Sequence, residues 1–460
     1  MKKLFLFICA FILIFSSGCD LIASLKPSPT PEPTQTNTPT IQPTNTATFT
    51  PEPTSTPTEV PTPTPTQGPP PITSENFLNH LDEIQDHIFE FFEVEDLEPL
   101  EVVFISMDEY LEVFQEREKT FDPYDYFYDS VIHNLFNLTS PVYDYNRYLT
   151  NMVNIEEELW GGVLNDYAEN QVKLVEDYVD PEMQLVNFIV AIETYVFLDR
   201  FEKEDNFDAL SQAGELTDTQ NLKSAIGRGT SLYTVKKWLE EYSSPDAQIP
   251  EAYMYPTTLI HDVVPLYLRA RAGIPADYGM AFVEHIDKEY GLPKMIEIAL
   301  NMPLFSSSAV HPERYPNEIT TNLEYIGLYD VLPEEWQIVT YDIMGEIFLI
   351  QFLENVVQQG IATDPETARQ IASAWGMDLV LLFINHDSNE VFVSYTVMLT
   401  NHEQYEALGL ELETIIEAMV NTGTPAVLNK EKNFTYNILI AVEEEALETA
   451  IEAYNEITGP

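Results

Sequence analysis

The sequence is poor in cysteine and in basic residues, and both shortages restrict what the chain can do. Of the 460 residues only two are cysteine, Cys9 and Cys19, so nothing after Cys19 can form a disulfide or a thiolate metal site. Lys and Arg number 21 against 76 Asp and Glu, which gives a net charge of −55. A phosphate backbone requires a basic face, so this imbalance excludes typical nucleic-acid binders and disfavours docking on anionic lipid by charge.

The sequence patterns of common active sites are also missing. The chain contains no HExxH pair, no GxSxG elbow and no phosphate-binding loop, and a catalytic cysteine is excluded in the part that can fold. The eight histidines are scattered, and none has a second histidine four residues further on. From these absences we expect no catalytic residue, no metal ligand set and no cofactor.

The N-terminus has the anatomy of an export signal. A short basic start precedes a 12-residue apolar run, Leu4–Phe15, which is too short to span a bilayer as a mature helix. Ser16-Ser17-Gly18 then leads to Cys19, an ending that resembles a bacterial lipobox, although Leu is usual where Ser16 stands. We expect residues 1–18 to be a signal peptide and Cys19 to carry lipid, which places the protein on the extracytoplasmic face of the membrane or the cell surface. The alternative is an ordinary cleaved signal followed by an incidental cysteine.

Composition divides the rest of the chain into a stalk and a folding region. Residues 27–71 carry 15 of the 32 prolines, alternating with Thr, and have almost no large apolar residue, so 19–73 is expected to be a polyproline-like stalk. From residue 74 the chain is rich in apolar residues and holds 18 basic and 72 acidic residues, a net charge of −54. We expect an α+β fold, with a mainly helical domain at 74–376 and a smaller α+β part at 377–460.

Hydrophobic periodicity predicts the elements of this fold. Apolar residues recur at helical spacing in ten segments, whereas β-rich runs flank the turn at Asp387-Ser388-Asn389 and recur near the C-terminus. The expected helices are 77–92, 107–116, 183–202, 221–242, 276–290, 293–300, 342–358, 365–374, 402–420 and 443–456, and the expected strands are 379–385, 391–399 and 435–442.

A series of short segments resembles, in order, a family of exported bacterial zincin-type proteins, the HExxH metallopeptidases of gluzincin character. The resemblance covers roughly residues 100–400 and implies a zincin-like helical domain, with a strand at 171–175. The matching segments are Met107–Phe114, Glu157–Tyr167, Gln171–Val175, Ala276–Val283, Ser306–Tyr315, Gly345-Glu346 and Trp375–Asp378.

The same resemblance implies that the metal ligands are missing. In the register that keeps the family's glutamate as Glu193, the two histidine positions hold Ile192 and Val196. In the register that keeps the later aspartate, they hold Ala191 and Tyr195. The third ligand, a glutamate in the family, falls near Arg228. Aliphatic side chains and a guanidinium cannot bind Zn²⁺, so these are expected to be vestigial metal-site positions without metal.

These substitutions suggest a structural hypothesis and a functional one. Arg228 could replace the cation by forming an ion pair with Glu193, while Ile192 and Val196 fill the vacated space. We expect a lipid-anchored, catalytically inactive metallopeptidase-like module that binds a peptide or a cell-surface protein. The alternative is an active metallohydrolase with an unrecognised site, built from His261, His285 or His311 with nearby carboxylates.

Overall fold

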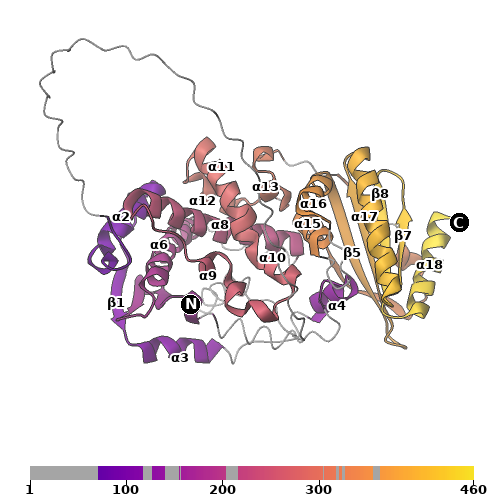
Figure 1. Cartoon of the computed structure of the whole chain (residues 1–460), viewed down its shortest axis with the longest axis horizontal. Helices are drawn as coiled ribbons and strands as arrows, with labels where there is room; N and C mark the ends of the chain where they lie inside the picture. Colours follow the sequence, from indigo (N-terminus) through magenta and orange to yellow (C-terminus); the bar gives the residue numbers. More distant parts are fainter. Residues whose placement is uncertain are drawn as a thin grey trace, which may run out of the picture. The chain divides into compact units, whose positions relative to one another are not determined.

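The computed structural model describes the folding region and leaves the N-terminal segments aside. It describes residues 71–117, 127–139, 155, 157–203, 216–303, 305–317, 321–323, 327–355 and 363–459. The expected signal peptide, Cys19 and almost the whole expected stalk lie outside these residues. Residues Ile72–Pro460 belong to one compact unit, and its described part is α+β, as expected (Figure 1).

One core of the helical part is built on two long helices, α6 (Pro181–Lys203) and α8 (Thr217–Tyr242). α6 begins at a proline, and the Asp180 carboxylate accepts a hydrogen bond from the Met183 N–H at 3.0 Å, which caps the first turn. α8 packs closely on η5 (Pro275–Gly279), because a methyl group on Gly279 would overlap the carbonyl of Ala225.

The other helices of this part are shorter. They are η1 (Phe77–Asn79), α2 (Leu81–Phe91), α3 (Met107–Arg117), α4 (Phe127–Leu135), α9 (Glu251–Met254), η4 (Pro256–Val263), α10 (Leu266–Ile274), α11 (Met280–Tyr290), α12 (Lys294–Leu300), α13 (Ser307–Val310), η6 (Pro312–Arg314) and α14 (Leu328–Val331). The expected helix at 276–290 is in fact the π-helical segment η5 followed by α11.

A small sheet of three strands lies against α6. β3 (Gln171–Val175) is the central strand, with β1 (Glu101–Ile105) parallel to it and β2 (Val163–Asp166) antiparallel to it. The Gln184 side chain on α6 donates a hydrogen bond to the Val175 carbonyl at 2.9 Å and so fixes the helix to the end of the central strand.

The large sheet is antiparallel, has the strand order β4-β5-β6-β8-β7 and carries helices on both faces (Figure 1). Along β5, Val380 and Leu382 face the core that contains α17, whereas Leu381 and Phe383 face the core that contains α18. Its elements are β4 (Trp336–Asp342), α15 (Gly345–Asn355), α16 (Pro365–Ala372), β5 (Trp375–Asn385), β6 (Val391–Leu399), α17 (His402–Asn421), β7 (Ala426–Lys430), β8 (Thr435–Ala441) and α18 (Glu444–Thr458).

One expectation about this region needs correction. Asp342 is the last residue of β4, so the helix expected from residue 342 begins only at Gly345, which has φ +83°. The domain boundary expected between 376 and 377 stays a prediction; both residues belong to β5. α15 lies between the two larger cores, with Ile347 in the helical core and Phe348 in the core on the α17 face of the sheet.

Candidate functional site

The positions matched to zinc ligands on α6 are packed as ordinary core. Ala191, Ile192 and Val196 are all 0% exposed, and Tyr195 stacks on the ring of Tyr167 with the centroids 6.0 Å apart. Neither register supplies an imidazole, thiolate or carboxylate at these positions. The structure places all four residues in the helical core.

Glu193 is a buried carboxyl whose hydrogen-bond partners are the hydroxyl groups of Ser231 and Thr194. It is 4% exposed, and its Oε2 accepts a hydrogen bond from the Ser231 hydroxyl on α8 at 2.8 Å. Burial raises the pKa of Glu193 to about 8, and the hydrogen bonds from Ser231 and Thr194 oppose this only in part. The carboxyl is therefore mainly protonated at neutral pH, which removes the need for a cation.

The expected ion pair between Glu193 and Arg228 does not form, and that hypothesis is wrong. In the part of the chain that the structure describes, no ion pair joins the two side chains. Arg228 instead donates from Nη2 to the carbonyl oxygen of Tyr253, and its guanidinium carbon lies 5.1 Å from the centre of the Tyr253 ring. Within one turn of α8, Ser231 therefore contacts Glu193 whereas Arg228 contacts α9.

These residues do not fit a zinc ion. Among the described residues no group of three or more His, Cys, Asp or Glu side chains is arranged to hold a metal. The hydrogen-bond partners of Glu193 are hydroxyl groups, and Ile192 and Val196 beside it are aliphatic, so the donor set of a zincin is not supplied at this place.

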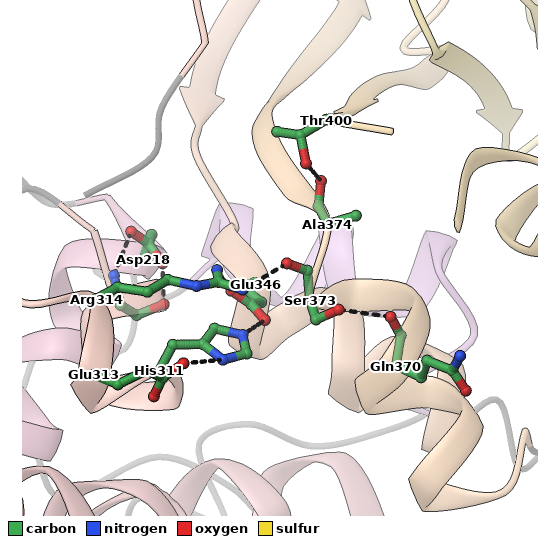
Figure 2. A network of polar contacts seen from close by, with 10 residues as sticks. Asp218, His311, Glu313, Arg314, Glu346, Gln370, Ser373, Ala374 and Thr400 are labelled. Atoms are coloured by element: carbon green, nitrogen blue, oxygen red, sulfur yellow. Dashed lines mark hydrogen bonds and ion pairs between the residues drawn. The ribbon is translucent and has the colours of Figure 1, made fainter. Parts of the chain in front are cut away.

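A second polar centre, the His311 junction, joins the segment after α13 to α15 and α16. We define it as His311, Glu313, Arg314, Glu346 and Ser373. Figure 2 shows the imidazole between two carboxylates: Nε2 lies 2.7 Å from Glu346 Oε1, and Nδ1 lies 3.6 Å from Glu313 Oε1. Arg314 donates from Nη2 to the Ser373 carbonyl at 3.0 Å and places Nη1 4.0 Å from Glu346 Oε2.

Glu346 is the most deeply buried acid of this junction. It is 0% exposed, and within the described part of the chain its Oε2 has no hydrogen-bond donor, since Arg314 lies beyond hydrogen-bonding distance. Burial raises the pKa of Glu346, whereas the hydrogen bond and charge of His311 and the charge of Arg314 act against this shift. An imidazole and a buried carboxyl at 2.7 Å can share one proton, which is the chemistry that this arrangement supports.

Two further buried carboxylates fix the start of α15 beside this pair. Asp378 accepts hydrogen bonds from the N–H groups of Met344 and Gly345 at 2.8 and 3.0 Å, and burial raises its pKa to about 6. Asp218 accepts from the N–H and hydroxyl of Ser306, and its carboxylate lies against the open side of Gly345. The position of Glu346 is thus set from α8, β5 and the segment before α13.

The structure brings together three segments that the sequence resemblance had matched separately. Ser306–Tyr315, Gly345-Glu346 and Trp375–Asp378 meet at the start of α15. Of the histidines named for an alternative site, His311 lies here, His285 is half-buried on α11, and the side chain of His261 lies outside the described residues. Sequence reasoning did not single out Glu346 or Arg314 as partners of His311.

Comparison of the chain with protein-family models, with curated proteins and with solved structures finds no match. Within the described residues, no helix has the length and apolar character needed to cross a bilayer.

Proposed function

We propose that this protein is a lipid-anchored extracytoplasmic module with a metallopeptidase-like helical scaffold that binds a peptide or a surface protein without hydrolysing it. The anchor is Cys19 and the spacer is the Pro/Thr-rich stalk. The segment order from Met107 to Asp378 supports descent from a zincin-type scaffold, and function resides in the site rather than in the scaffold.

One observation carries the non-catalytic part of this proposal. Glu193, which is the acid at the position of a zincin general base, is buried with a hydroxyl partner, and Ile192 and Val196 beside it are fully buried aliphatic residues. A general base must reach a metal-bound water and be ionised near the working pH. A carboxyl with a pKa of about 8 and no metal ligand beside it meets neither requirement.

Peptidase assays on the purified protein test this proposal. The chain is incubated with casein and with a fluorogenic peptide mixture, with added Zn²⁺ and with a chelator, and Glu193→Gln serves as the matched variant. We expect no hydrolysis above buffer in any arm. Zinc-dependent hydrolysis that the chelator removes would contradict the proposal, and its persistence in Glu193→Gln would place the activity elsewhere in the chain.

The alternative, an active metallohydrolase, is supported by one contact, that between His311 and Glu346. Chelator-sensitive hydrolysis that survives Glu193→Gln and disappears in His311→Phe would favour this alternative over a binding module. The described residues supply no third ligand beside this pair.

A further inference from the structure

His311 lies in the segment 306–315, which is held at its start, in its middle and at its end by separate contacts. At its start, Ser306 donates to the buried Asp218 carboxylate. At its end, the ring of Tyr315 lies edge-on to Phe282 with the centroids 6.0 Å apart. Between these anchors, His311 and Arg314 make polar contacts with α15 and α16.

The middle contact is sensitive to the number of protons it holds. With one shared proton, the 2.7 Å contact between His311 Nε2 and Glu346 Oε1 is a charge-assisted hydrogen bond. When that proton is lost, the carboxylate, which is 0% exposed, keeps a single hydrogen bond from the neutral imidazole, and its other oxygen has no donor among the described residues. An ionised group that is buried without full compensation is costly, so the loss of the proton favours exposure of Glu346 to water.

The charges around the pair do not remove this sensitivity. From η6, Arg314 places a cation 4.0 Å from Glu346 Oε2, while Glu313 places an anion 3.6 Å from His311 Nδ1, so the two act in opposite directions. From α8, the buried Asp218 carboxylate accepts hydrogen bonds from Ser306, and from β5, the buried Asp378 carboxylate accepts hydrogen bonds from the N–H groups of Met344 and Gly345 beside Glu346. α16 contributes the Ser373 carbonyl, which is neutral.

We propose that the contact between His311 and Glu346 is a pH-sensitive latch, which holds the stretch His311–Arg314 on α15 and α16 and releases it as the pH rises. Release would free the Arg314 guanidinium and expose the start of α15, while the anchors at Ser306 and Tyr315 stay in place. The fold would therefore open locally rather than unfold. This inference concerns the junction alone and does not depend on the proposed function.

The direction of the effect follows from proton linkage. Burial raises the pKa of Glu346 in the closed state above the ordinary value of 4.5, which applies when the side chain reaches water. The open state therefore loses its proton first as the pH rises, and opening becomes more favourable from about pH 4.5 up to the raised value. Release of one proton changes the opening equilibrium by at most about tenfold per pH unit within that window.

Hydrogen exchange on the full chain tests the latch. Exchange of peptides that cover 309–316 is followed from pH 5 to pH 9, and the intrinsic pH effect is removed by comparison with peptides from α18, which packs on the other face of the sheet. We expect protection of 309–316 to fall with rising pH, by at least tenfold relative to α18, and we expect this fall to be absent in Glu346→Gln. Glu334→Gln, at an exposed residue outside the junction, is the matched control and should respond like the wild type.

A second variant keeps the test decisive if Glu346→Gln fails to fold. His311→Phe removes the imidazole that shares the proton with Glu346, and the side chain at position 311 is partly exposed. At pH 5 it should exchange in 309–316 as fast as the wild type does at pH 9. Equal pH responses of 309–316 and α18 in the wild type would overturn the latch, and so would a retained response in Glu346→Gln or full protection in His311→Phe at pH 5.

Discussion

Replacing Glu193 with glutamine should make the stability of the protein less dependent on pH. Burial raises the pKa of Glu193 to about 8, whereas the unfolded chain has the ordinary value of 4.5. The folded state therefore keeps a proton that the unfolded state releases. The stability that this group contributes is complete below the unfolded value and is lost as the pH rises through 8.

The size of the effect follows from the two pKa values. One pKa unit corresponds to 1.36 kcal/mol, so ionising Glu193 inside the fold costs roughly 5 kcal/mol, of which about 4 kcal/mol falls between pH 5 and pH 9. Glutamine keeps the volume of the side chain and can accept the hydrogen bond that Ser231 donates at 2.8 Å. We therefore expect Glu193→Gln to fold and to lose this part of the pH dependence.

Urea unfolding followed by tryptophan fluorescence measures the effect. The free energy of unfolding is determined at half-unit steps from pH 5 to pH 9 at constant ionic strength, because the large negative charge also weakens the fold as the pH rises. Glu456→Gln, at an exposed position on α18, removes one acid without this burial. The wild type minus Glu193→Gln difference should fall by about 4 kcal/mol across the range. A constant difference, or one equal to that of Glu456→Gln, would refute the reasoning.

Two other variants test the geometry and the anchor. Gly345→Ala should destabilise the protein by about 1–3 kcal/mol more than Gly423→Ala in urea unfolding, since both glycines have positive φ but only Gly345 would press a methyl group into the Asp218 carboxylate; equal losses would contradict the close packing. Cys19→Ala should move the protein from the membrane pellet to the soluble fraction and abolish incorporation of labelled fatty acid, whereas retention in the pellet would argue against a lipid anchor.

Hydrophobic periodicity predicted the long elements of the fold, because each of them buries a regular stripe in a core. The helix expected at 183–202 is α6, and the strands expected at 379–385 and 391–399 form the hairpin of β5 and β6. Short strands were missed. β1 and β7 have five residues each, which is too few for alternation to be recognised, and β4 runs into the apolar sequence of α15, so its period was masked.

The candidate site was less predictable, because its contacts join segments that are distant in the sequence. The aliphatic side chains of Ile192 and Val196 cannot bind zinc, and both are fully buried in the structure. The sequence could not show that Ser231 rather than Arg228 faces Glu193, since both lie on α8 within one turn of each other. The pairing of His311 with Glu346 spans 35 residues and was not predicted.

Zinc content is the measurement that tests the central claim most directly. The purified chain is saturated with Zn²⁺, freed of loosely bound ion by gel filtration and analysed by elemental mass spectrometry, alongside hydrogen exchange of α6. We predict well under one zinc per chain and unchanged protection of the peptide that contains Glu193. One tightly held zinc per chain that slows exchange around residues 191–196 would contradict the account.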